Sequence, residues 1–292
     1  MKKIKTAGRA IERSMKYIFT VCGLITVLFV LLITVFLLIY GIPAIREIGL
    51  WNFITGRRWA PTAANPEYGI LPFILSSVFG TLGAVAIGVP LGLLCGVFLS
   101  KMAHRGVAGV VRGAVELLSG IPSVVYGLIG MMVVVPAVRE AFDLPDGANM
   151  FSAIIVLTVM ILPTVISVSE TSLKAVPREY EEASLALGAT KIETVFRVSL
   201  PAARSGILTA VVLGVGRAIG EAMAIMMVSG NVPTNMPGLF KSVRFLTTAV
   251  ASEMSYASGL QREALFSVSL VLFVFIMIIN ILLELIGRKR DK

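Results

Sequence analysis

The chain has 292 residues, of which 57% are hydrophobic and 15% are charged, and its formal net charge is +9. A soluble domain of this size is far less apolar, so the composition indicates a protein that crosses a membrane several times. One histidine and two cysteines give no basis for a metal cluster, and no cofactor is expected.

Six apolar stretches are each long enough to cross a bilayer, which takes about 20 apolar residues. Backbone polar groups must be bonded within the bilayer and no alternating barrel pattern is present, so each stretch is expected to be a helix. The expected spans are residues 17–42, 70–99, 107–138, 151–172, 206–230 and 264–286. The sequence therefore predicts an all-α, polytopic integral membrane protein with six transmembrane helices. Pro90 and Pro122 lie inside the second and third spans and predict a tilt or a kink there.

The first span is too long for a signal peptide, and no small-residue cleavage site follows it before Pro43, so we expect it to be retained. The external loop after it contains Trp51 and Trp59. We interpret these tryptophans as anchors at the membrane interface. The alternative is that they help to bind an extracytoplasmic partner.

The lysines and arginines predict the orientation of the chain. With the N-terminus inside, inner segments hold 17 of them and outer segments hold 7. The positive-inside rule then places both termini in the cytoplasm, with the chain in the plasma (inner) membrane. The expected parts are a basic cytoplasmic start (1–16), a first helix with its external loop (17–69), a core of five transmembrane helices (70–286) and a cytoplasmic tail (287–292). Membrane lipid is an expected partner, whereas nucleic acid is not, because no basic patch is interleaved with aromatic residues.

Three acidic residues near span ends have ordinary interpretations. Glu116 is expected to lie close to water at the inner end of the third span. The alternative is an ion pair with Arg112, which lies four residues earlier. Glu170 and Glu284 are expected to be interfacial.

A polar island separates the fourth and fifth spans at residues 180–201. It reads Glu182-Ala183-Ser184, three residues, Gly188, nine residues, and Val198-Ser199-Leu200-Pro201. Acidic residues favour the start of a helix, and glycine adopts turn conformations that other residues resist. The spacing predicts a short helix, a glycine turn and a second helix across the cytoplasmic face, at about residues 178–201. The alternative is a solvated loop with an ordinary capping pattern.

This island resembles the coupling helix of type I ABC importer permeases, whose pattern is E-A-A-x3-G-x9-I-x-L-P. Here Ser184 replaces the second alanine and Val198 replaces the isoleucine. The resemblance implies that a cytosolic ATPase is contacted by Glu182, Ala183, Ser184 and Gly188, and that residues 70–286 form a permease core. The chain has no G-x4-G-K-[ST] phosphate loop. It is therefore expected not to be an enzyme and to work with a separate ATP-hydrolysing subunit.

The fifth span contains two charged residues, Arg217 and Glu221, four positions apart and hence on one face of a continuous helix. An arginine near the middle of the membrane costs about 2.5–3.5 kcal/mol on insertion scales. We favour the interpretation that the pair lines or gates a route for an anion, because the guanidinium group suits phosphate oxygens. The alternative is a charge pair that fixes the packing between spans.

Several segments are similar to phosphate-specific permeases of the PstC type. The segments are residues 59–61, 68–72, 116–127 and 216–224. In the last of them, Ala222 replaces the threonine of the pattern G-R-A-I-G-E-T-M-A. The similarity covers about residues 51–285. It implies that the chain translocates inorganic phosphate and that Arg217 and Glu221 matter for its passage. The implied partners are a second, homologous permease subunit (PstA type), two cytosolic ATPase subunits (PstB type) and an extracytoplasmic phosphate-binding protein (PstS type).

Three alternative functions stay open. The first is a permease for another oxyanion, such as molybdate or sulfate, but the sequence of residues 216–221 argues against it. An ion-coupled secondary transporter would leave the island unexplained. An intramembrane enzyme is disfavoured, because the spans contain no Ser/His set, paired aspartates or H-E-x-x-H motif.

Overall fold

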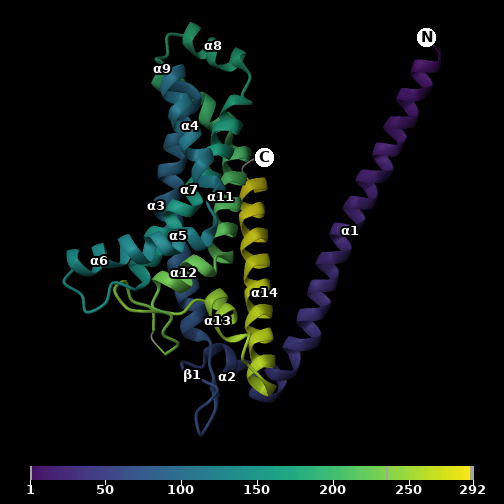
Figure 1. The fold of residues 1–292 in the computed structure, drawn as a ribbon. Helices are drawn as coiled ribbons and strands as arrows, with labels where there is room; N and C mark the ends of the chain where they lie inside the picture. Colours follow the sequence, from purple (N-terminus) through teal and green to yellow (C-terminus); the bar gives the residue numbers. More distant parts are fainter. Residues whose placement is uncertain (1, 235, 290–292) are drawn as a thin grey trace.

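The computed structural model describes residues 2–234 and 236–289. Residue 1 of the expected basic start and residues 290–292 of the expected tail lie outside the described residues. The chain is a bundle of long helices (Figure 1), with a group of short helices at one end and a small β-hairpin at the other. We call these the island end and the hairpin end.

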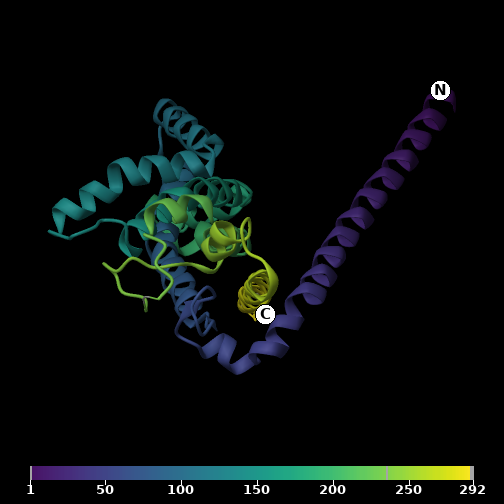
Figure 2. The same ribbon diagram turned by 60° about the horizontal axis from the view of Figure 1, so that its bottom comes forward.

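Five helices in the described part of the chain are long and apolar enough to cross a membrane, or six if one bent helix pair counts as a span. The first is α1 (Lys2–Ile48), which diverges from the rest of the molecule in both views (Figures 1 and 2). Its last turns meet α14 (Gly259–Lys289), where Ser267 Oγ donates to the carbonyl of Gly41 at 2.5 Å.

Two helices form the centre of the bundle, α3 (Leu71–Val97) and α7 (Met150–Lys174). Three glycines of α3 face α7 at intervals of four residues. A Cβ atom on Gly88, Gly92 or Gly96 would lie 2.6, 2.8 or 2.9 Å from a side-chain atom of Ile161, Val165 or Ser169, respectively. Because small residues at this spacing let two helices approach closely, α3 and α7 pack as a tight pair.

The predicted third span is not one kinked helix. It consists of α4 (Arg105–Gly120) and, after a break at Ile121 and Pro122, a second stretch that extends sideways from the bundle (Figure 1). That stretch contains α5 (Ser123–Ile129), a π-helical turn (Gly130–Val134) and α6 (Val135–Ala141). Proline disfavours helical backbone in the residue before it, and Ile121 is extended, with ψ of 127°.

The predicted fifth span is also interrupted. It is formed by α11 (Arg204–Gly220) and α12 (Met223–Val228), and the backbone at Glu221 is extended, with ψ of 130°. At its other end α11 meets the preceding helical segment, Lys191–Ala202, at a bend of 72°.

The island end and the hairpin end complete the fold. The island end contains α8 (Arg178–Ala186), α9 (Lys191–Thr194), a π-helical turn (Val195–Ser199) and α10 (Leu200–Ala202). The hairpin end contains α2 (Leu50–Thr55), the antiparallel strands β1 (Trp59–Ala60) and β2 (Glu67–Tyr68), and α13 (Leu246–Glu253). The two ends lie on opposite sides of the bundle (Figure 1).

Candidate functional site

The island is a helix, a glycine turn and a second helix. Gly188 follows α8 with φ of +89°, a conformation that favours glycine, and an added Cβ there would meet no atom within 4 Å. A capping box starts α9: Glu193 N donates to Thr190 Oγ1 at 3.3 Å, and Thr190 N donates to the Glu193 carboxylate at 2.9 Å. These local bonds fix the turn, so the island is an ordered element.

The predicted contact residues of the island do not all face outward. Glu182, Ala183 and Gly188 are exposed, whereas Ser184 is half-buried and its hydroxyl is hydrogen-bonded to Thr194 Oγ1 at 3.0 Å. Ser184 therefore joins α8 to α9, and the exposed surface is formed by its neighbours.

Sequence reasoning missed the apolar part of this surface. The side chain of Leu187, beside the glycine turn, is 90% exposed, and Ile192 and Tyr180 are 61% and 55% exposed. Leu187 is the C-cap of α8 before the turn glycine and Ile192 lies in α9 after it, so apolar groups are exposed on both sides of the turn. The signal available in the sequence was an apolar residue next to a turn glycine within a polar segment.

A second carboxylate on α8 points into the protein. Glu181 Oε1 accepts hydrogen bonds from Lys101 Nζ and, at 2.8 Å, from Ser199 Oγ. Burial raises the pKa of Glu181, but the hydrogen bonds from Lys101 and Ser199 outweigh it, and the pKa is lowered from its ordinary value. Glu181 is therefore an ionised group that ties α8 to two other segments.

The structure separates Arg217 from Glu221. Arg217 is in the last turn of α11, but the helix ends at Gly220, so the two residues do not share a helix face as predicted. Glu221 instead accepts a hydrogen bond from Ala224 N at 3.0 Å, and its own carbonyl accepts one from Thr247 Oγ1 at 2.7 Å. The Glu221 carboxylate thus satisfies one backbone N–H at the break, and the Thr247 hydroxyl satisfies one carbonyl there.

Arg217 consequently remains without a carboxylate partner among the described residues. It is half-buried, and an added Cβ on Gly216 or Gly220 beside it would meet no atom within 4 Å. Arg217 is thus a half-buried cation beside a helix break.

Of the acidic residues near the ends of α4 and α7, Glu170 differs from expectation, whereas Glu116 is exposed as expected. Arg112 Nε donates to Glu170 Oε1 at 2.7 Å, and Lys174 Nζ lies 2.6 Å from the same oxygen. The side chain of Glu170 is only 9% exposed, so it is a buried, paired group and not an interfacial one. Arg112 therefore does not pair with Glu116, which is exposed and borders a hollow beside the break at Pro122.

A buried polar cluster lies at the hairpin end. Glu253 Oε2 accepts hydrogen bonds from Trp59 Nε1 at 3.0 Å and from Gln261 Nε2 at 2.9 Å, and Glu253 Oε1 pairs with Arg244. Arg244 NH2 also donates to the carbonyl of Asn231 at 3.0 Å. Trp59 is 2% exposed, so it is neither an interface anchor nor a partner contact, whereas Trp51 is 76% exposed.

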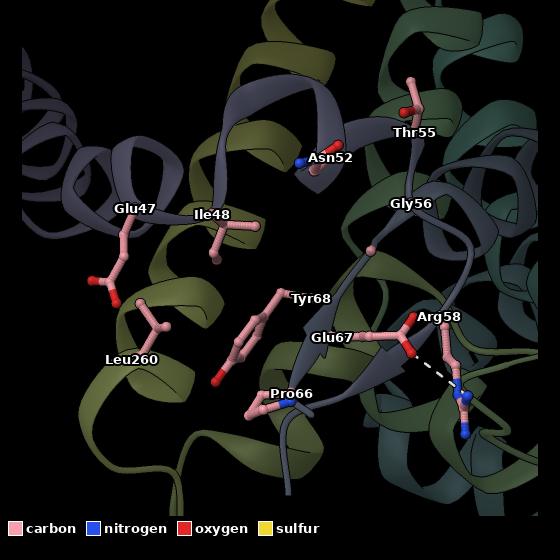
Figure 3. Close-up of a pocket in the computed structure, with 11 residues that line it drawn as sticks. Glu47, Ile48, Asn52, Thr55, Gly56, Arg58, Pro66, Glu67, Tyr68 and Leu260 are labelled. Atoms are coloured by element: carbon pink, nitrogen blue, oxygen red, sulfur yellow. Dashed lines mark ion pairs between the residues drawn. The ribbon is translucent and has the colours of Figure 1, made fainter. Parts of the chain in front are cut away.

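A pocket of about 550 Å³ opens beside this cluster, between the end of α1 and the hairpin. Figure 3 shows the Glu67 carboxylate reaching toward Arg58, at 3.5 Å, and the Tyr68 side chain extending the other way, toward Glu47 and Leu260. Burial and the nearby Glu47 carboxylate raise the pKa of Tyr68, so its hydroxyl is a neutral donor at physiological pH. Within residues 2–234 and 236–289, no group of three or more His, Cys, Asp or Glu residues could hold a metal ion.

Several solved ABC transporter structures share this architecture. An inward-facing form of the MetNI methionine ABC transporter superposes with a TM-score of 0.60, at 21% identity, over 76% of this chain and 96% of that one. A bacterial alginate ABC transporter, solved with an alginate pentasaccharide-bound periplasmic protein, gives a TM-score of 0.62 at 14% identity over 94% of both chains. At these identities the likeness concerns the fold, which is that of type I ABC importer permeases.

Curated relatives match at higher identity. The chain is 36% identical over 279 residues to the probable ABC transporter permease protein YqgH of Bacillus subtilis, covering 94% of this chain and 90% of the relative. It is 33% identical over 294 residues to the phosphate transport system permease protein PstC of Haemophilus influenzae, covering 91% and 92%. Residues 88–292 match the family described as binding-protein-dependent transport system inner membrane component. This chain belongs to that family of inner-membrane transport components.

Proposed function

We propose that this chain is the permease subunit of an ATP-driven importer and moves inorganic phosphate across the plasma membrane by alternating access. The observation that carries the proposal is the island, an ordered helix–turn–helix with Glu182 and the apolar Leu187 exposed. A chain that presents such a surface and has no phosphate loop of its own must obtain ATP hydrolysis from a partner. The similarity to PstC over 91% of the chain favours phosphate as the solute.

The proposed complex has four kinds of subunit. This chain pairs with a second, homologous permease of the PstA type, and two ATPase subunits of the PstB type bind the island from the cytoplasm. A phosphate-binding protein of the PstS type delivers the anion at the hairpin end. Both termini of this chain are then cytoplasmic, in agreement with the excess of lysine and arginine in the inner segments.

In this proposal Arg217 serves the phosphate route and Glu221 serves the helix break. The Glu221 carboxylate is bonded to Ala224 N, so it shapes the start of α12 and does not neutralise Arg217. The guanidinium group can therefore offer its donors to phosphate oxygens during passage.

The experiment that tests the proposal uses the whole complex in lipid vesicles. Phosphate-loaded binding protein should raise ATP turnover and drive phosphate uptake, whereas molybdate and sulfate should do neither. Stimulation by molybdate or sulfate alone would identify another oxyanion importer. Uptake by this chain without ATPase subunits, driven by an ion gradient, would identify a secondary transporter and end the proposal.

The docking role of the island has its own variant, Glu182→Lys. Charge reversal on the exposed face should abolish stimulated ATP turnover while the protein still inserts into the membrane. Glu140→Lys is the matched control, because Glu140 is also exposed but lies near the end of α6, away from the island. Normal stimulation of the Glu182→Lys complex would refute the docking role.

The phosphate route is tested with Arg217→Gln. Loss of one charge-assisted hydrogen bond should lower phosphate uptake at least about tenfold, while the subunits remain associated. Arg139→Gln removes an exposed arginine at the end of α6 and should leave uptake unchanged. Unchanged uptake in Arg217→Gln would leave only a packing role for this residue.

A further inference from the structure

The island is tied to the centre of the bundle through the inward-facing carboxylate of α8. Glu181 Oε1 accepts hydrogen bonds from Lys101 Nζ, 80 residues earlier in the chain, and from Ser199 Oγ. The side chains of Lys101 and Glu181 are only 13% and 25% exposed. A sheltered ion pair is screened by salt less than a surface pair, so this contact can hold the two segments together at physiological ionic strength.

Both partners of Glu181 lie in π-helical turns. Lys101 belongs to the turn Phe98–Met102, which ends α3, and Ser199 belongs to the turn Val195–Ser199, which follows α9. A π turn accommodates one extra residue in a helix, redirects the side chains after it and is frequent at functional sites. Here two such turns present their side chains to one oxygen of one carboxylate.

The segment that carries Lys101 continues directly into the tightest helix pair of the bundle. Through Gly88, Gly92 and Gly96, α3 packs against α7 with no space for a single additional methyl group. Closely packed interiors transmit displacement because they are not easily compressed. A pull on Lys101 therefore acts on α3 and α7 together.

The orientation of the two neighbouring glutamates separates two tasks. Glu182 is exposed on the outer face of α8, where a partner can reach it, whereas Glu181 is half-buried and bonded inward. Consecutive residues of a helix point about 100° apart. One short helix can thus contact a partner with one carboxylate and the bundle with the next.

We infer that Glu181 is a positioning residue and that its ion pair with Lys101 transmits movement of the island to the α3–α7 pair. The inference rests on the proposed function, because it requires an ATPase that moves the island. It goes beyond docking by naming the contact inside this chain through which the movement reaches the membrane-spanning helices.

The test measures phosphate transported per ATP hydrolysed by the complete importer in lipid vesicles, with phosphate-loaded binding protein outside. Lys101→Met and Glu181→Gln each remove one charge and keep most of the side-chain volume. Each should lower the transport ratio about 2- to 30-fold, while the ATPase subunits remain bound and continue to hydrolyse ATP. A merely structural defect would lower transport and hydrolysis together.

The reciprocal exchange, Lys101→Glu with Glu181→Lys, restores an ion pair of opposite polarity and should recover part of the ratio. Arg105→Met is the matched control for Lys101→Met, because it removes an exposed cation four residues later in the chain. We expect it to keep the wild-type ratio. If the single variants fail to fold, the exchange variant decides: a folded exchange variant with a ratio well below wild type would overturn the inference.

Two other outcomes would also overturn it. The first is a wild-type ratio in both single variants. The second is loss of the ATPase subunits from Glu181→Gln but not from Lys101→Met, since Glu181 would then contact the ATPase directly. The proposed function is judged separately, from the wild-type complex. It stands if phosphate-loaded binding protein stimulates ATP turnover by that complex, and it fails if there is no stimulation.

Discussion

The two ends of the molecule use carboxylates in opposite ways. At the hairpin end, Glu253 is 6% exposed and receives donors from Trp59, Arg244 and Gln261. At the island end, Glu182 is exposed, and its neighbour Leu187 is 90% exposed. One carboxylate is enclosed by donors from three separate segments, and the other is presented to solvent.

This difference indicates different mechanical properties. Elements with many buried contacts unfold only when most of the protein unfolds, whereas elements with few buried contacts can move or unfold locally at a lower free-energy cost. Phe53, Phe73 and Leu246 are fully buried around the hairpin end, but α8 buries no residue completely. The hairpin end is thus a rigid platform, and α8 of the island is an accessible element held by a few specific bonds.

Removal of the buried carboxylate at the hairpin end should produce the largest effect on stability. Glu253→Ala leaves Arg244 buried without its partner, which typically costs about 3–5 kcal/mol. The free energy of unfolding of the detergent-solubilised protein, measured by denaturant titration, should fall accordingly. Glu140→Ala, at an exposed position, should change it by no more than about 0.5 kcal/mol. Equal losses in the two variants would contradict the view of the hairpin end as a platform.

The helices follow from local patterns, whereas the polar cluster does not. Long apolar runs predict membrane helices because each helix satisfies its own backbone. The Trp59–Glu253 hydrogen bond joins residues 194 positions apart. No local pattern contains that pairing, so the most natural interpretation of Trp59 was a membrane anchor, and the structure corrects it.

The two interrupted spans also depend on contacts that local sequence patterns do not contain. Pro122 predicts a disturbance, but the turn of α5 and α6 away from α4 depends on what those helices pack against. The break at Glu221 has no proline, and it is stabilised by Thr247, which lies 26 residues away. The charges Arg217 and Glu221 were therefore identified from the sequence, but their assignment to one helix face was wrong.

A close backbone contact should make the hairpin end sensitive to a single methyl group. In Gly69→Ala the added Cβ would lie 2.3 Å from the backbone carbon of Gly56, and backbone atoms cannot move aside as a flexible side chain can. Overpacking of this kind costs about 1–3 kcal/mol. Denaturant unfolding should detect the loss. A wild-type midpoint would show that α2 and the hairpin can separate freely.

The turn glycine of the island should respond differently. Gly188→Ala meets no neighbouring atom, but φ of +89° strains any residue with a Cβ, by about 1–2 kcal/mol. Because α8, which Gly188 follows, buries no residue against the bundle, we expect a nearly unchanged global unfolding midpoint together with reduced stimulated ATP turnover. Gly23→Ala, in α1 with open space around it, is the control for a helical glycine. A fall in the global midpoint as large as that of Gly69→Ala would show that the island is part of the rigid bundle.

The smallest effect should be the dependence of the island on pH. The pKa of Glu181 is lowered in the folded protein, because the hydrogen bonds from Lys101 and Ser199 outweigh the opposing effect of burial. Its contribution to stability is therefore complete above the ordinary carboxyl pKa and is lost as the pH falls through the lowered folded-state value. Hydrogen exchange of the α8 amides, compared between wild type and Glu181→Gln, should show a difference at neutral pH that disappears once the pH is below the lowered folded-state pKa. Glu179→Gln removes an exposed carboxylate from the same helix and should show no such convergence. A difference that persisted unchanged in acid would mean that the amide substitution acts through shape, and that the charge of Glu181 does not hold the island to α3.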